Sequence, residues 1–188
     1  NLRPRGCSLE ILNLSKNSFQ ITQPADCLAL ERLVALTPTI VELNLSCCNL
    51  GVPAGEALGK GLRNHPTLTS LNLSRNRLEE YGVKKLCKGL HENSVLKNLD
   101  LARNSMSGRG ASGVAQLLSN TNCGIETLSL YGNFIGIEGA RFIATSLEKN
   151  STLTDLDIGL NRMRPKGVNA IANALKKNST LKVLRLKQ

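Results

Sequence analysis

One phrase, L-x-x-L-x-L-x-x-N-x-L, recurs seven times along this chain of 188 residues at nearly constant spacing. Successive copies begin 31, 28, 28, 29, 28 and 28 residues apart. They start at Leu9, Ile40, Leu68, Leu96, Ile125, Leu153 and Leu181, and the last copy is cut short by the end of the chain. A period of this length indicates one supersecondary unit stacked several times, because a single unit cannot bury its own apolar face. The period therefore predicts an elongated solenoid.

Each repeat divides into a strand and a helix. In the third copy, Leu71 and Leu73 point to one face of the predicted strand, and polar residues point to the other. The stripe of an amphipathic helix follows at spacing i, i+3, i+4 and i+7, formed by Val83, Leu86, Cys87 and Leu90. Parallel stacking of such units gives an α/β fold in which strands line the concave side and helices the convex side.

Two local features of the helical halves stand out. A glycine precedes the stripe in four repeats, at Gly82, Gly110, Gly139 and Gly167. We expect these glycines to supply either an unusual backbone conformation or a close helix entry. The first repeat is longer than the others, with Pro24 where the stripe should begin and Glu31 interrupting it, so we expect a different loop there.

The ninth position of the phrase is Asn in most copies and Cys48 in the second. At the end of each strand the chain turns inward and buries backbone groups that no neighbouring strand can reach. A buried carboxamide carries both donors and acceptors, so it can satisfy the backbone of its own turn and of the next one. We predict a ladder of buried amides, and a loss of about 1–3 kcal/mol of stability in Asn104→Ala.

The full helix in each unit, with starts such as Gly139-Ala140-Arg141-Phe142-Ile143-Ala144, resembles the ribonuclease-inhibitor-like class of leucine-rich repeats. This class includes ribonuclease inhibitor, Ran GTPase activators, the sensing regions of NOD-like receptors, tropomodulin and CARMIL-type actin regulators. The resemblance implies a right-handed leucine-rich repeat solenoid, or horseshoe, with a parallel concave sheet and convex helices. Residues 1–188 would form a single domain of about six full repeats and a truncated seventh, as a fragment of a longer chain.

The sequence offers no constellation for catalysis. The only histidines, His65 and His91, fall in helix-to-strand loops, where we expect a structural or idle role. Neither a CxxC nor an HExxH motif occurs, and no glycine-rich segment has the composition of a phosphate-binding loop. We therefore expect a protein–protein recognition scaffold that is not an enzyme and uses no cofactor, metal or small-molecule substrate. The alternative is a GTPase-activating regulatory domain that resembles the Ran activator.

The net charge of +10 suggests an acidic partner. Arginines recur beside the ladder position, and residues at matching positions of a solenoid stack in columns. These arginines would form a basic rim that steers an acidic protein. They are Arg75, Arg77, Arg103, Arg162 and Arg164. The alternative is that the excess charge is a solvated helix face. We do not expect nucleic acid, because aromatic residues make up only 3% of the chain and no groove-binding motif occurs.

The outward strand positions are mostly small and polar, except in the fifth and sixth repeats. There Tyr131 and Leu160 oppose each other diagonally across two glycines. Three carboxylates flank them, at Asp100, Asp155 and Asp157. An aromatic anchor in polar surroundings is typical of an interface hot spot, so we expect an accessible Tyr131 to bind the partner. The alternative is an ordinary exposed tyrosine.

The six cysteines indicate a reducing environment. Cys48 stands in the ladder, Cys27 and Cys87 on helical stripes, and Cys7 and Cys123 at equivalent sites before their strands, all of which are positions for small hydrophobes. No apolar run is long enough to span a membrane. We therefore expect an intracellular, cytoplasmic protein with free thiols.

Overall fold

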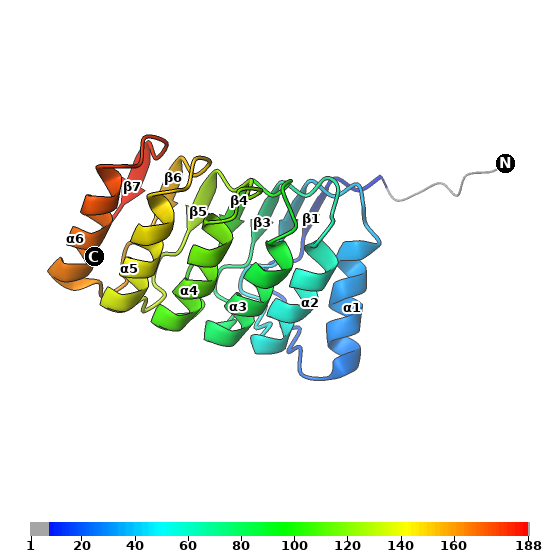
Figure 1. The fold of residues 1–188 in the computed structure, drawn as a ribbon. Helices are drawn as coiled ribbons and strands as arrows, with labels where there is room; N and C mark the ends of the chain where they lie inside the picture. The colour runs from blue at the N-terminus through cyan, green and yellow to red at the C-terminus, as the bar shows by residue number, and fades with distance from the viewer. Residues whose placement is uncertain (1–7, 188) are drawn as a thin grey trace.

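The computed structural model describes residues 8–187, and within them seven short strands alternate with six helices. The helices stand side by side in one layer in front of the sheet (Figure 1). The strands are β1 Ile11–Asn13, β2 Glu42–Asn44, β3 Ser70–Asn72, β4 Asn98–Asp100, β5 Thr127–Ser129, β6 Asp155–Asp157 and β7 Val183–Arg185. The helices are α1 Pro24–Ala35, α2 Val52–Leu62, α3 Glu79–Leu90, α4 Ser107–Leu118, α5 Gly136–Leu147 and α6 Arg164–Leu175. The predicted leucine-rich repeat solenoid is confirmed.

The sheet is parallel and its strands follow chain order from β1 to β7. The register pairs equivalent positions of successive repeats, so Leu43 faces Leu71 and Leu71 faces Leu99. Neighbouring strands lie about 4.8 Å apart, whereas packed helices need about 8–10 Å. The array therefore curves with the strands on its concave side.

The core lies between the sheet and the helices. The inward strand residues Leu71 and Leu73 are fully buried, as are Val83 and Leu86 on the predicted helical stripe. None of the helices within residues 8–187 is long and apolar enough to cross a membrane.

The buried amide ladder is present, and Asn104 illustrates its geometry. The Asn104 carboxamide nitrogen donates to the carbonyls of Leu73, Leu101 and Ala102 at 2.9–3.3 Å. Its oxygen accepts from the N–H groups of Asn76 and Leu78 in the preceding repeat. Each rung therefore joins two repeats, which is the role that the sequence predicts. At the second rung the Cys48 thiol donates to the Leu14 carbonyl over 3.0 Å.

The four glycines before the helical stripes serve close packing rather than an unusual backbone. None of them has a positive φ. A Cβ at Gly139 would lie 2.3 Å from Cγ2 of Ile135 and 3.0 Å from Cβ of Ala111 on α4. Of the two roles expected, the close helix entry is the one found.

Left-handed backbone conformations occur instead in the turns that follow strands β1 to β6. In the third repeat Arg75, Arg77 and Glu79 have φ of 60°, 57° and 55°. The same three positions are left-handed in the fifth repeat, where Gly132 and Gly136 occupy the first and third of them. L-residues adopt this region at a cost of about 1–2 kcal/mol each, so the ladder must stabilise the turn against that cost.

The turns before β3 and β4 carry a second polar column, at His65 and Asn93. The oxygen of Asn93 accepts from the N–H groups of Val95 and Leu96, and its amide donates to the Leu62 carbonyl in the preceding repeat. His65 is buried at the equivalent place, and its Nδ1 accepts from the N–H groups of Thr67 and Leu68. The structural role expected of His65 is confirmed, whereas His91 is exposed.

The first repeat contains a helix in spite of its irregular sequence. Pro24 is the first residue of α1, where the missing N–H has no partner to lose. Gln23 and Asp26 form a capping box around this start. Among the cysteines, Cys48, Cys87 and Cys123 are buried and Cys47 is exposed, all as free thiols. Cys7 lies outside the described residues.

Candidate protein-binding surface

Two residues predicted to bind a partner lie where β5 and β6 run into their turns. Tyr131 follows β5 and Leu160 follows β6, and the glycines between them leave room for both side chains. A Cβ at Gly159 would lie 3.2 Å from Cδ2 of Tyr131, and a Cβ at Gly132 would lie 3.8 Å from Cδ2 of Leu160. Tyr131 and Leu160 thus lie on a floor of two glycines, in the diagonal arrangement that the sequence predicts.

Tyr131 is less open than the sequence suggests. The guanidinium carbon of Arg103 lies 5.4 Å from the centre of its ring, a cation–π distance. The Tyr131 side chain is therefore half-buried between Arg103 and Gly159, while Leu160 is 43% exposed. Because its neighbours already limit its rotation, Tyr131 would lose little side-chain entropy on binding.

The three carboxylates around Tyr131 differ in their surroundings. Asp155 forms a two-pronged ion pair with Arg185 of β7, which raises the pKa of Arg185. Burial raises the pKa of Asp100, although the N–H of Ala102 donates to it at 2.9 Å. Asp157 accepts from the N–H of Gly159 at 3.0 Å. All three side chains thus have partners within this domain.

The arginines predicted as a rim fall into two groups rather than one column. Arg75 and Arg103 occupy the same turn position of neighbouring repeats, and Gly132 and Leu160 continue that column. Arg162 lies one position past the ladder asparagine, in the column of Arg77. Each of these arginines is exposed. The fifth repeat, which has no arginine in its turn, separates the two groups.

Phe134 lies in the turn of the fifth repeat, and its exposure is not predicted from the sequence. Its side chain is 49% exposed, and the guanidinium carbon of Arg162 lies 4.7 Å from its ring centre. Its φ of 58° is in the left-handed region, so Phe134 belongs to neither the strand before it nor the helix after it. The signal was present in the sequence, since Phe134 is the only aromatic residue at that column of the repeat. We call Arg103, Tyr131, Phe134, Leu160 and Arg162 the aromatic–arginine patch.

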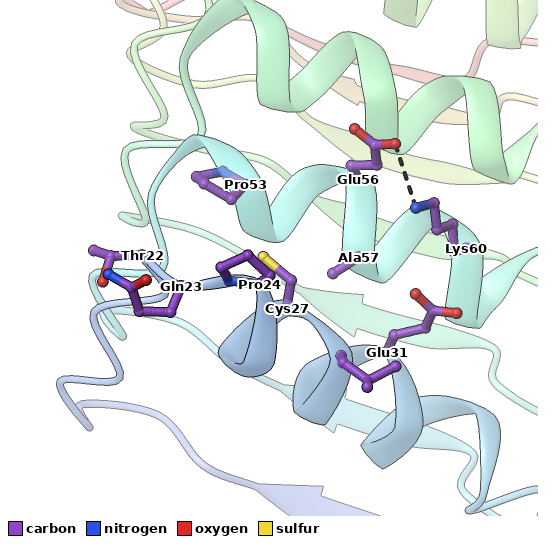
Figure 2. Close-up of a pocket in the computed structure, with 10 residues that line it drawn as sticks. Thr22, Gln23, Pro24, Cys27, Glu31, Pro53, Glu56, Ala57 and Lys60 are labelled. Atoms are coloured by element: carbon purple, nitrogen blue, oxygen red, sulfur yellow. Dashed lines mark ion pairs between the residues drawn. The ribbon is translucent and has the colours of Figure 1, made fainter.

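The convex side has grooves between its helices. The groove between α1 and α2 has a volume of about 500 Å³, and Figure 2 shows Cys27 of α1 and Ala57 of α2 along it. Glu56 and Lys60 form an ion pair of 3.4 Å at its edge. This groove is shallow and mostly apolar. No group of three potential metal ligands occurs within residues 8–187.

The chain is similar to known proteins in its repeats and in its fold. The family described as "Leucine Rich repeat" matches residues 38–59, 64–87, 92–115 and 149–172, which together make half of the chain. Among solved structures, one described as "Leiomodin-1 Actin-Binding Site 2 (ABS2)" superposes with a TM-score of 0.62. It is 20% identical in sequence, and the match covers 83% of this chain and 92% of that one. At this identity the likeness shows a shared fold. No curated protein sequence matches the chain.

Proposed function

Because this chain belongs to the leucine-rich repeat family, we propose that it is a protein-recognition module that binds its partner through the aromatic–arginine patch. Two aromatic residues, two arginines and a leucine make up the patch, and aromatic residues and arginine are enriched in protein interfaces. The repeats contribute a rigid frame, so the patch needs little rearrangement when a partner binds.

The observation that carries this proposal is the place of the exposed apolar side chains. Phe134 and Leu160 are large and exposed, and they lie in the turns after the interior strands β5 and β6. Within the described strands, the large exposed residues Ile11 and Val183 are on the edge strands β1 and β7. An exposed aromatic residue and an exposed aliphatic residue in neighbouring turns of the interior repeats are typical of a binding site.

The charge around the patch favours an acidic partner surface. Within residues 8–187, Arg75, Arg77 and Arg164 form no ion pair. Unpaired charges at a rim act mainly on the rate of association, because they attract a partner before contact. We therefore expect association to slow when salt rises from about 50 to about 500 mM, since the screening length falls about threefold.

The first partner to test is actin, because the leiomodin-1 fragment that shares this fold is described as an actin-binding site. The experiment is hydrogen–deuterium exchange of the chain with and without monomeric actin. Amides of residues 129–134 and 157–163 should exchange more slowly in the complex, and those of α3 should not change. Protection restricted to the helices would refute docking at the patch, and the absence of a complex would remove actin as the partner.

A charge-reversal series tests the rim separately. The triple variant Arg75→Glu, Arg103→Glu and Arg162→Glu should slow association by about tenfold or more. The matched control reverses three exposed charges elsewhere, as Arg32→Glu, Arg141→Glu and Lys149→Glu. Equal effects of the two triple variants would mean that net charge alone steers the partner, and the rim would have no special role.

A further inference from the structure

Helices α2 and α3 stand side by side on the face of the molecule away from the sheet (Figure 1). A second charged surface lies on these two helices and at the C-terminal end of α2. We call it the convex basic patch, formed by Lys60, Arg63, Lys84, Lys85 and Lys88. It includes a groove of about 540 Å³ that runs beside α3, floored by Cys87, Gly113 and Leu117. A smaller hollow of about 120 Å³ adjoins it on the α2 side.

Close helix packing gathers these cations. A Cβ at Gly89 would lie 2.2 Å from the carbonyl oxygen of Gly59, so α2 and α3 approach each other at backbone distance. A Cβ at Gly113 would lie 2.9 Å from Cγ of Lys84, so the stem of that lysine lies across α4. Long side chains on helices this close cannot spread inward, and their ammonium groups project together into solvent.

The positive charge of the convex basic patch is only partly compensated. Glu56 is shared by two lysines, with its oxygens 3.4 Å from Nζ of Lys60 and 3.3 Å from Nζ of Lys85. Arg63 pairs with Glu92 at 3.7 Å. Lys84 and Lys88 form no ion pair with any residue between 8 and 187. Five cations thus face two carboxylates, which leaves three positive charges in excess.

One aromatic side chain borders the groove. Tyr81 is 56% exposed, and Nζ of Lys85 lies 5.2 Å from the centre of its ring. The ammonium group occupies one ring face, where a nucleobase would otherwise stack. The same groove is lined by the apolar side chains of Cys87 and Leu117. This arrangement favours a polypeptide with an apolar side chain over a single-stranded nucleic acid.

We propose that the convex basic patch binds an acidic polypeptide segment of about six residues, and that an apolar side chain of this segment lies beside Tyr81. The size follows from the helices: two helix spacings of about 8–10 Å give a width of about 20 Å, which about six extended residues span. The segment would run across α2, α3 and α4, with its carboxylates on Lys84 and Lys88. This surface is separate from the aromatic–arginine patch, so it adds a second contact to the proposed function and does not depend on it.

Tyr81 itself can report the binding. The chain has two tyrosines and no tryptophan, so in a Tyr131→Phe background the tyrosine fluorescence comes from Tyr81 alone. Titration with hexaglutamate at about 50 mM salt should change this fluorescence with saturation. The variant Lys84→Glu with Lys88→Glu should weaken the affinity by about tenfold or more, because attraction becomes repulsion at two sites. Circular dichroism checks that the fold is retained.

The control changes the net charge equally at another place. Lys166→Glu with Lys176→Glu alters two exposed lysines of the α6 region that form no ion pair within residues 8–187, and should weaken hexaglutamate binding by less than about twofold. Equal losses in both double variants, or no saturable signal with the unreversed chain, would overturn the proposal. Tighter binding of hexathymidylate than of hexaglutamate would also overturn it and would assign the surface to nucleic acid. A peptide of five glutamates and one leucine should bind more tightly than hexaglutamate, and weaker binding would refute the apolar contact at Tyr81.

Discussion

Asn104→Ala tests the physical basis of the stacked repeats. The substitution removes three hydrogen bonds donated by the side chain and two that it accepts. The three carbonyls each keep another donor. Leu73 still accepts from Asn76, Leu101 from Asn133, and Ala102 from the N–H of Arg75. The carbonyl side of the network therefore tolerates the loss.

The two N–H groups have no such reserve. The N–H groups of Asn76 and Leu78 bond to the Asn104 oxygen and to no other group within the described residues. A buried donor without a partner costs about 1–3 kcal/mol. Two such donors give an expected loss of about 2–6 kcal/mol in the free energy of unfolding. This loss is larger than the about 1–3 kcal/mol predicted from the sequence.

Urea denaturation followed by circular dichroism measures this loss as the change in free energy of unfolding. The matched control is Asn17→Ala at the first rung. The exposed Asn17 donates to the Leu14 carbonyl, and within residues 8–187 no N–H group donates to its side-chain oxygen. We expect that variant to lose about 1 kcal/mol or less. Losses that agree within about 0.5 kcal/mol between the two variants would refute the argument that orphaned N–H groups dominate.

Three further predictions follow from the turns and thiols. Burial lowers the pKa of His65 below its usual value of 6.5, so the folded state holds fewer protons than the unfolded state and stability falls as pH drops below about 6.5. The variant His65→Asn places at this position the residue that occupies position 93, and its stability should fall less at low pH. Melting temperatures of both proteins at about pH 7.5 and about pH 5.5 measure the difference. The same pH dependence in the variant and the original chain would contradict the burial of a neutral imidazole. Arg77→Gly should stabilise the chain by about 0.5–1 kcal/mol in urea, because φ is 57° there, whereas a loss of stability would contradict the strained turn. Iodoacetamide should alkylate the exposed Cys47 in the native protein and spare Cys87, because burial raises the pKa of the Cys87 thiol to about 12. Peptide mass spectrometry measures the labelling, and equal labelling of the two cysteines would contradict this prediction.

The fold was predictable from the sequence because its information is periodic. A leucine at a given position of one repeat pairs with the leucine at the same position of the next, as Leu71 does with Leu99. The period thus determines the register, the parallel sheet and the helix layer together. The buried role of the ladder asparagine was predictable because buried backbone N–H and C=O groups need hydrogen-bond partners. A turn that buries such groups needs a residue with both donor and acceptor atoms.

The details of the candidate surface were less predictable, because they depend on side chains from different repeats. The column order indicated Tyr131 and Leu160, but not that Arg103 would cover the tyrosine ring. Asp155 was expected as part of an acidic surround, and its ion pair with Arg185 depends on the register with β7. Phe134 was overlooked because its column points to the rim and its φ is positive.

The most direct test of the account is the affinity of Tyr131→Ala for monomeric actin, measured beside Tyr81→Ala. The two variants remove the only tyrosines of the chain, one from the aromatic–arginine patch and one from the convex side. Tyr131→Ala should weaken binding by about 2 kcal/mol or more, which is a rise of about 30-fold in Kd, and Tyr81→Ala should leave it unchanged. The unfolding free energy of Tyr131→Ala should fall by less than about 1 kcal/mol, because the side chain is only half-buried and lies between Arg103 and a glycine. Unchanged affinity in Tyr131→Ala, or a larger loss in Tyr81→Ala, would contradict recognition through the concave face.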